Sequence, residues 1–244
     1  SVLDNLKSDG KTSWNQNYLL VPDVMGNGVF IREYFDYFLL SHFEMVDSPL
    51  KKQDLKCWIF IDPAFSTSDI SDDAVIIWAG EHKASKHKYL IDGYSDTSAP
   101  SRTINAVIVM YNNMTAQWFK IDFISCEDVK LNKNQTNFIE NLRLELQKYN
   151  IHVPLYLYHP KLRKEQRIKD NLEAPMSQKW WKFNRNITQP NFLAKLEKQL
   201  LEFPFWDHDD HPDCLSQAQE VFSNKKYEWD AREMSFTVDY SSLL

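Results

Sequence analysis

The sequence predicts an α/β fold: a mixed five-stranded sheet, made of an antiparallel meander and two parallel strands, with helices on both faces. Short apolar runs bounded by turn residues recur along the chain, which is typical of strands. Segments with apolar residues at helical spacing separate the later runs. Such segments act as crossovers, and crossovers connect parallel strands.

The meander comes first. Its predicted strands are CWIFID at residues 57–62, DDAVIIWAG at 72–80 and KHKYLIDGYS at 86–95. Turn residues separate the three runs, which favours antiparallel neighbours.

The two parallel strands alternate with helices. Pro100 and Ser101 suit the start of a helix, and Ile104, Val107 and Ile108 follow at helical spacing. In chain order the elements are a helix over 100–117, the strand WFKIDFISCE at 118–127, a helix over 134–150 and the strand HVPLYLYHP at 152–160.

The last part of the chain predicts one short strand and two helices. QKWWKFN at 178–184 is typical of a short exposed strand or hairpin, and TQPNFLAKLEKQLLEF at 188–203 of a helix. The final helix is expected near Pro212 to Phe222. Four aspartates and two histidines occupy the seven positions around its start, from Asp207 to Asp213.

Residues 1–50 read differently from residues 51–244, which we expect to form one domain. The first 28 residues are polar and rich in turn formers, VFIREYFDYFLLSHF at 29–43 predicts an amphipathic helix, and a linker follows. DGKTS at 9–13 contains Gly-Lys-Thr, but a phosphate-binding loop also needs a glycine at position 5, which is Asn5. The sequence therefore predicts no ATP site in this chain.

Composition narrows the class of protein. The net charge of −6 argues against a protein that coats nucleic acid. Acidic residues gather at 62–73 and 207–213, and a basic run, KLRKEQRIK, stands at 161–169. The three cysteines include no Cys-x-x-Cys pair, so neither a disulfide framework nor a zinc ribbon is expected. No apolar run reaches the roughly 20 residues that span a bilayer, so no membrane partner is expected.

Acidic residues stand where strands end and where the last helix begins. Asp62 ends the first strand, Glu127 ends the fourth, and Asp209 and Asp210 precede the final helix. If the first and fourth strands are neighbours, these carboxylates converge at one sheet edge, where open α/β sheets place their chemistry. Converging carboxylates repel one another unless a hard cation such as Mg²⁺ or Mn²⁺ lies between them, and two such ions catalyse phosphodiester hydrolysis.

Each acid also has a simpler interpretation. Asp62 precedes Pro63 and suits a turn, and Glu127 suits an exposed position after a strand. Aspartates at a helix N-terminus are favoured by the helix dipole alone. His208, His211 and Cys214 invite a zinc site, but their spacing fits no common structural zinc site.

Three segments carry a resemblance to a known family. They are FIDPAFSTSDISDDAVIIWAG at 60–80, RIKDNLEAPMSQKWWKFN at 167–184 and LEFPFWDHDDHPDCLSQA at 201–218. From about Cys57 to Phe222 the chain resembles the C-terminal nuclease domain of the large terminase subunit, the DNA-packaging protein of tailed bacteriophages. WNQNYLLVPD at 14–23 is similar to the tail of that family's motor domain.

The resemblance implies an RNase H-like fold and metal-dependent cleavage of double-stranded viral DNA concatemers, with Mg²⁺ or Mn²⁺ as cofactor. It implies metal-binding and catalytic roles for Asp62, Glu127, Asp209 and Asp210, with Asp73 and Asp213 as accessory acids, and it leaves open which aspartate of the last group is the third ligand. Residues 1–50 would be the tail of an upstream ATPase. The further partners implied are the small terminase subunit and the portal protein, in the host cytoplasm at the procapsid portal.

Basic residues provide candidate DNA contacts, because cations that contact phosphates bind DNA without reading its sequence. Trp180, Trp181 and Phe183 suit either the side of a bound duplex or the core. Two other functions fit the same residues: a transposase, integrase or junction resolvase of the same fold, and a portal-docking module without catalysis. The candidate DNA contacts are Lys161, Arg163, Lys164, Arg167, Lys169, Lys179, Lys182 and Arg185.

Overall fold

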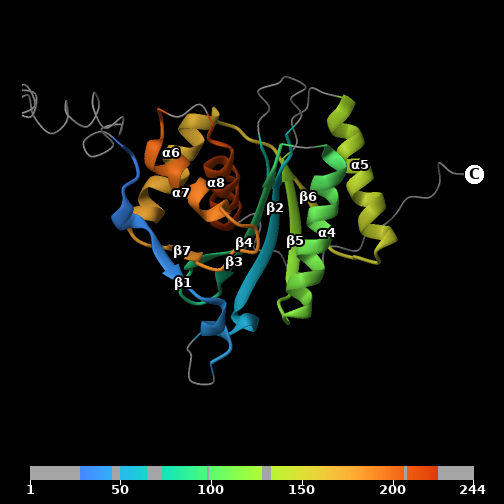
Figure 1. Cartoon of the computed structure of the whole chain (residues 1–244), viewed down its shortest axis with the longest axis horizontal. Helices are drawn as coiled ribbons and strands as arrows, with labels where there is room; N and C mark the ends of the chain where they lie inside the picture. Colours follow the sequence, from blue (N-terminus) through green and yellow to red (C-terminus); the bar gives the residue numbers. More distant parts are fainter. Residues whose placement is uncertain are drawn as a thin grey trace, which may run out of the picture.

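A seven-stranded mixed sheet forms the centre of the molecule, in the order β1-β7-β4-β3-β2-β5-β6. The computed structural model describes residues 28–45, 50–64, 73–97, 99–127, 133–205 and 208–224, with the backbone alone for 133–137. Helices α4 and α5 cover one face of the sheet, and α6, α7 and α8 cover the other (Figure 1).

The predicted meander is confirmed. Strands β2 (Leu55–Asp62), β3 (Ala74–His82) and β4 (Lys88–Asp96) pair in antiparallel fashion in chain order. Ile59, Phe60 and Ile61 of β2 are fully buried, because helices cover both faces of this central strand.

The parallel half of the sheet is also confirmed. Helix α4 (Pro100–Ala116) leads to β5 (Ile121–Glu127), which lies parallel to β2, and α5 (Lys133–Lys148) leads to β6 (Leu155–Tyr158), which lies parallel to β5. Ile61 pairs with Cys126. The next residues along these two strands are Asp62 and Glu127, so the register brings both acids to the same edge of the sheet.

Two short strands extend the sheet beyond the five that the sequence predicts. Strand β7 (Trp181–Asn184) lies parallel to β4, and β1 (Asp36–Phe38) lies parallel to β7. The strand at 178–184 was expected to be exposed, but Trp181 and Phe183 are fully buried. These two aromatic residues therefore pack in the core, and Trp180 before them stays 41% exposed.

The prediction of a helix over residues 29–43 is wrong. This segment forms the 3-10 helix η1 (Arg32–Tyr34), strand β1 and the 3-10 helix η2 (Leu40–Phe43), and a third 3-10 helix, η3 (Lys52–Asp54), precedes β2. The segment is rich in aromatic residues, which favour strands, and pairing with β7 overrides its weak helical pattern. Strand β1 thus belongs to the same sheet as the strands after residue 50.

The helices on the second face are α6 (Lys164–Ser177), α7 (Phe192–Glu202) and α8 (Asp210–Ser223). The basic run at 161–169 enters α6, an element that the sequence did not predict. Helix α8 packs on β2 and β3, and its residues from Asp210 to Gln219 are all buried. The helices that the structure describes are too short or too polar to span a bilayer.

Candidate metal centre and active site

Three carboxylates converge at the end of the two central strands. Asp62 ends β2, Glu127 ends β5 and Asp213 lies in the first turn of α8. One oxygen from each lies within 4.8 Å of the others. Among the residues that the structure describes, these three side chains are the ones that could hold a metal ion together.

Helix α8 brings the third carboxylate to the strand ends. Asp209 is its N-cap, and Asp210 and Asp213 stand in its first turn, where the positive end of the helix dipole stabilises negative charge. Pro212 fits this turn because the first residues of a helix need no backbone donor. Asp210 and Asp213 are 4% exposed, so both side chains point into the protein.

Arg167 of α6 holds Asp213 in place. Its Nε donates to Asp213 Oδ1 at 2.8 Å, and its terminal Nη2 donates to Asp213 Oδ2 at 2.6 Å. The same nitrogen lies 3.7 Å from Glu127 Oε2. Arg167 is 3% exposed, so it lies inside the acidic site. A contact with a DNA phosphate would require this side chain at the surface.

Lys164, one turn earlier in α6, bridges the other two aspartates. Its Nζ lies 2.6 Å from Asp209 Oδ1 and 2.7 Å from Asp210 Oδ1. The second oxygen of Asp210 accepts a hydrogen bond of 3.0 Å from the backbone nitrogen of Asp73. Burial opposes the charged form of Lys164, but Asp210 and Asp209 outweigh burial and hold the pKa of the ammonium above its ordinary value.

Asp73 completes the acidic rim just before β3. Its Oδ2 pairs with the ammonium of Lys195 from α7, a contact that the sequence does not suggest. These side chains surround an open cavity of about 330 Å³. It is lined by Asp62, Pro63, Ala64, Asp73, Glu127, Lys164, Arg167, Asp210 and Asp213.

The electrostatics of the cavity favour a bound cation. Burial, and then the charges of Glu127 and Asp213, raise the pKa of Asp62 well above its ordinary value. Burial raises the pKa of Glu127 to about 7, although Arg167 opposes this shift. Burial also raises the pKa of Asp213 against the same arginine. A cation between these groups stabilises their ionised forms.

The donor set fits a hard divalent ion. All three ligand atoms are carboxylate oxygens, which Mg²⁺ and Mn²⁺ prefer. The soft or nitrogen donors nearby point elsewhere: the Cys214 thiol donates to the carbonyl oxygens of Phe60 and Val75, and the His211 ring lies 4.9 Å from the ring of Phe192. Among the described residues nothing supports the zinc alternative.

Apart from Lys164 and Arg167, the predicted basic residues form two groups. Lys161, Arg163 and Lys169 are exposed at or beside the start of α6, the helix that carries Lys164. The other group lies at β7. Lys182 pairs with Asp36 of β1, Arg185 lies over the Tyr37 ring at 4.9 Å, and Lys179 is exposed before the strand.

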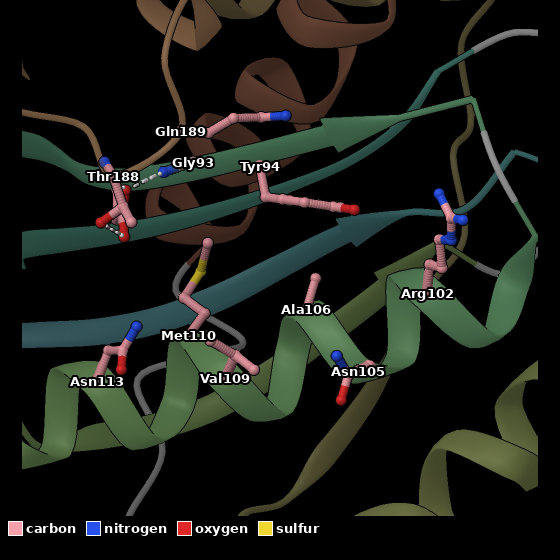
Figure 2. Close-up of a pocket in the computed structure, with 11 residues that line it drawn as sticks. Gly93, Tyr94, Arg102, Asn105, Ala106, Val109, Met110, Asn113, Thr188 and Gln189 are labelled. Carbon is pink, nitrogen blue, oxygen red and sulfur yellow. Dashed lines mark hydrogen bonds between the residues drawn. The ribbon is translucent and has the colours of Figure 1, made fainter.

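A larger cavity, of about 510 Å³, lies between α4 and β4 (Figure 2). Its carboxylate, Asp92, accepts hydrogen bonds from Gly93 N, from Thr188 N and from the Thr188 hydroxyl. Beside it, Gln189 accepts a hydrogen bond from Ser95 N and donates one to Ser95 O, beyond the residues of β4 that pair with β7. These bonds give Asp92 a structural role, and the smaller, acidic cavity is the candidate site.

The structure brings together Asp62, Asp73, Glu127, Asp210 and Asp213 around one cavity, and Asp209 lies at its side, bound to Lys164. Asp213, which the resemblance implied only as an accessory acid, belongs to the group of three oxygens. Its spacing from Asp210, three residues along a helix, is the sequence signal for a shared face. No feature of the sequence indicates that Lys195 contacts this site.

No family model and no curated protein matches this sequence. Solved structures do. The nuclease domain of the human cytomegalovirus terminase superposes with a TM-score of 0.59 at 12% identity, over 80% of this chain and 94% of that domain. The same domain soaked with manganese gives 0.58 at 10% identity, over 81% and 95%. The large terminase nuclease domain of Thermus phage P74-26 gives 0.50 at 13% identity, over 82% and 97%.

At these identities the likeness concerns the fold. The chain has the fold of terminase nuclease domains, so the RNase H-like fold that the resemblance implied is confirmed. The sheet has seven strands in place of the five expected.

Proposed function

We propose that this protein is a metal-dependent endonuclease that cuts double-stranded DNA. The observation that carries the proposal is the meeting of Asp62, Glu127 and Asp213, whose oxygens lie within 4.8 Å of one another at the end of two adjacent strands. The terminase nuclease fold supports it, and a relative of that fold was soaked with manganese.

Asp62, Glu127 and Asp213 would hold the divalent ion, Mg²⁺ or Mn²⁺. When bound, such an ion supplies Lewis-acid activation of the phosphodiester and of the attacking water. Arg167 fixes the orientation of Asp213 through two hydrogen bonds, so this carboxylate needs no reorganisation when the ion binds. The remaining acids of the cavity are held by Lys164 and Lys195.

The duplex would reach the cavity over the start of α6. Lys161, Arg163 and Lys169 are exposed there and would contact phosphates. Binding through phosphates predicts little base preference and an affinity that falls with salt. Lys179, Lys182 and Arg185 would contact a more distant stretch of the duplex.

In the cell we propose that the substrate is a viral genome concatemer, cut as packaging begins and ends. Residues 51–244, together with strand β1 of the same sheet, would form the nuclease domain, and the start of the chain would join it to an ATPase domain. The partners would be that ATPase, the small terminase subunit and the portal protein, in the host cytoplasm at the procapsid portal. The support is the resemblance together with the viral terminase folds that superpose on this chain.

The test is cleavage of supercoiled plasmid in Mn²⁺ or Mg²⁺. We expect the wild type to nick and linearise the plasmid, and Asp62→Asn and Asp213→Asn to lose about 100-fold or more, because a lost Lewis acid is worth several kcal/mol. Asp170→Asn, an exposed acid of α6, is the matched control and should cut normally. A wild type that cuts in neither metal contradicts the proposal and favours a docking module. A strong preference for four-way junctions over linear duplex favours a resolvase.

A further inference from the structure

The Lys164 ammonium lies between Asp209 and Asp210, where a second divalent ion would otherwise bind. Its Nζ contacts one oxygen of Asp209 and one of Asp210, at 2.6 and 2.7 Å. The other oxygen of Asp210 accepts a hydrogen bond from the Asp73 backbone nitrogen. The aspartates closest in sequence to Asp213 are therefore bound by an ammonium.

The backbone that carries Lys164 is firmly anchored. Lys164 is the first residue of α6, and Arg167, one turn later, is locked onto Asp213 by two hydrogen bonds. The Lys164 side chain is 37% exposed, so its ammonium is half-buried and still open to the cavity that it lines. Charge-assisted hydrogen bonds to two carboxylates hold this ammonium in place.

The charges of the cavity match one divalent ion. Five carboxylates line it: Asp62, Asp73, Glu127, Asp210 and Asp213. In the part of the chain that the structure describes, Lys164 pairs with Asp210 and Lys195 with Asp73, while Arg167 pairs with both Asp213 and Glu127. The net charge of these eight groups is two negative charges, which one divalent ion neutralises. Asp209, 23% exposed, does not line the cavity and is stabilised by water as well as by Lys164.

We propose that the Lys164 ammonium occupies the position of a second cation, so that the site binds one divalent ion in place of the two expected from the sequence. The inference rests on the proposed nuclease function and specifies its metal requirement. The divalent ion would then lie on the Glu127 side of the cavity. On the Asp210 side, the Lys164 ammonium would be the cation that faces the DNA phosphate.

The experiment counts Mn²⁺ ions bound per chain. Electron paramagnetic resonance of unbound Mn²⁺, measured across a titration without DNA, gives this number independently of activity. We expect one ion for the wild type and two for Lys164→Met, because this variant frees the oxygens of Asp209 and Asp210. Lys169→Met is the matched control, since it removes an exposed lysine of the same helix and should leave the count at one.

The outcomes separate the inference from the function on which it rests. Two ions in a wild type that cuts DNA overturn the role of Lys164 and leave the nuclease intact. One ion in a folded Lys164→Met variant also overturns it. No bound Mn²⁺ and no cleavage by the wild type overturn the proposed function and the inference together. If Lys164→Met does not fold, the wild-type count decides alone.

Discussion

Arg167 and Asp213 form a buried pair with two parallel hydrogen bonds, of 2.8 and 2.6 Å, at the point where α6 meets the first turn of α8. The guanidinium is 4% and the carboxylate 5% exposed. This pair fixes one of the three carboxylates of the candidate metal centre, so the stability of the domain and the geometry of the site depend on the same contact.

The first prediction concerns this pair. Arg167→Met leaves Asp213 charged and buried without its partner, which should lower the free energy of unfolding by about 3–5 kcal/mol in a urea titration without metal. The matched control is Arg102→Met, since Arg102 is 72% exposed and lies 3.9 Å from Asp96. That pair should contribute less than about 1 kcal/mol. Equal losses in the two variants would contradict the structural role of Arg167.

The second prediction concerns pH. The pKa of Glu127 is raised to about 7, so the folded protein binds this proton more tightly than the unfolded chain does. The free energy of unfolding therefore falls as pH rises from about 4.5 through about 7 when no metal is present. Glu127→Gln cannot ionise, so it should be more stable than the wild type at pH 8, by on the order of 2–3 kcal/mol, and not at pH 4.

Mn²⁺ should reverse this order. Added at pH 8, the ion stabilises the wild type and not Glu127→Gln, because only the wild type keeps all three carboxylates. Melting temperatures of both proteins, with and without the ion, check this. A wild type that is already the more stable protein at pH 8 without metal would show that burial does not disfavour the ionised form of Glu127.

Part of the site could be predicted from the sequence, because it depends on local patterns. Asp62 and Glu127 each follow an apolar strand, and once the strands are seen as parallel neighbours, their positions follow. The position of Asp213 is harder to predict, because a shift of one residue in the start of α8 changes which aspartate faces the strands. The role of Arg167 could not be predicted, because a buried arginine and a surface arginine look alike in a basic run.

The pairing at this edge of the sheet could not be predicted for a similar reason. A short strand or hairpin was predicted at 178–184, but not its place beside β4, and β1 lies in a segment predicted as a helix. Strands β1 and β7 have three and four residues, and the paired residues Asp36 and Lys182 are 146 positions apart. Such pairing depends on tertiary contacts that a local pattern does not record.

The third prediction tests the packing of α7 on the sheet. A Cβ added at Gly93 of β4 would lie 2.3 Å from the ring of Phe192, the first residue of α7. Gly93→Ala should therefore lower the free energy of unfolding by about 1–3 kcal/mol, because a buried ring has to move. Gly80→Ala is the control, since its Cβ would meet no atom closer than 3.1 Å and should cost less in the same denaturation experiment.

The fourth prediction separates the two groups of basic residues. Replacing Lys161, Arg163 and Lys169 together by alanine should weaken binding to a short duplex. It should also reduce the slope of log affinity against log salt by about 0.9 for each phosphate that the variant no longer neutralises. Fluorescence anisotropy at several salt concentrations, in Ca²⁺ to avoid cleavage, gives both values. Replacing Lys179, Lys182 and Arg185 should have the smaller effect. The reverse order would place the duplex along β7 instead of α6.

The most direct test of the metal centre is anomalous scattering from crystals soaked in Mn²⁺, recorded at the manganese absorption edge. We predict one peak, in contact with the carboxylates of Asp62, Glu127 and Asp213, with the Lys164 ammonium still on Asp209 and Asp210. A peak bound by other side chains, or no peak at a Mn²⁺ concentration that supports cleavage, would contradict the site.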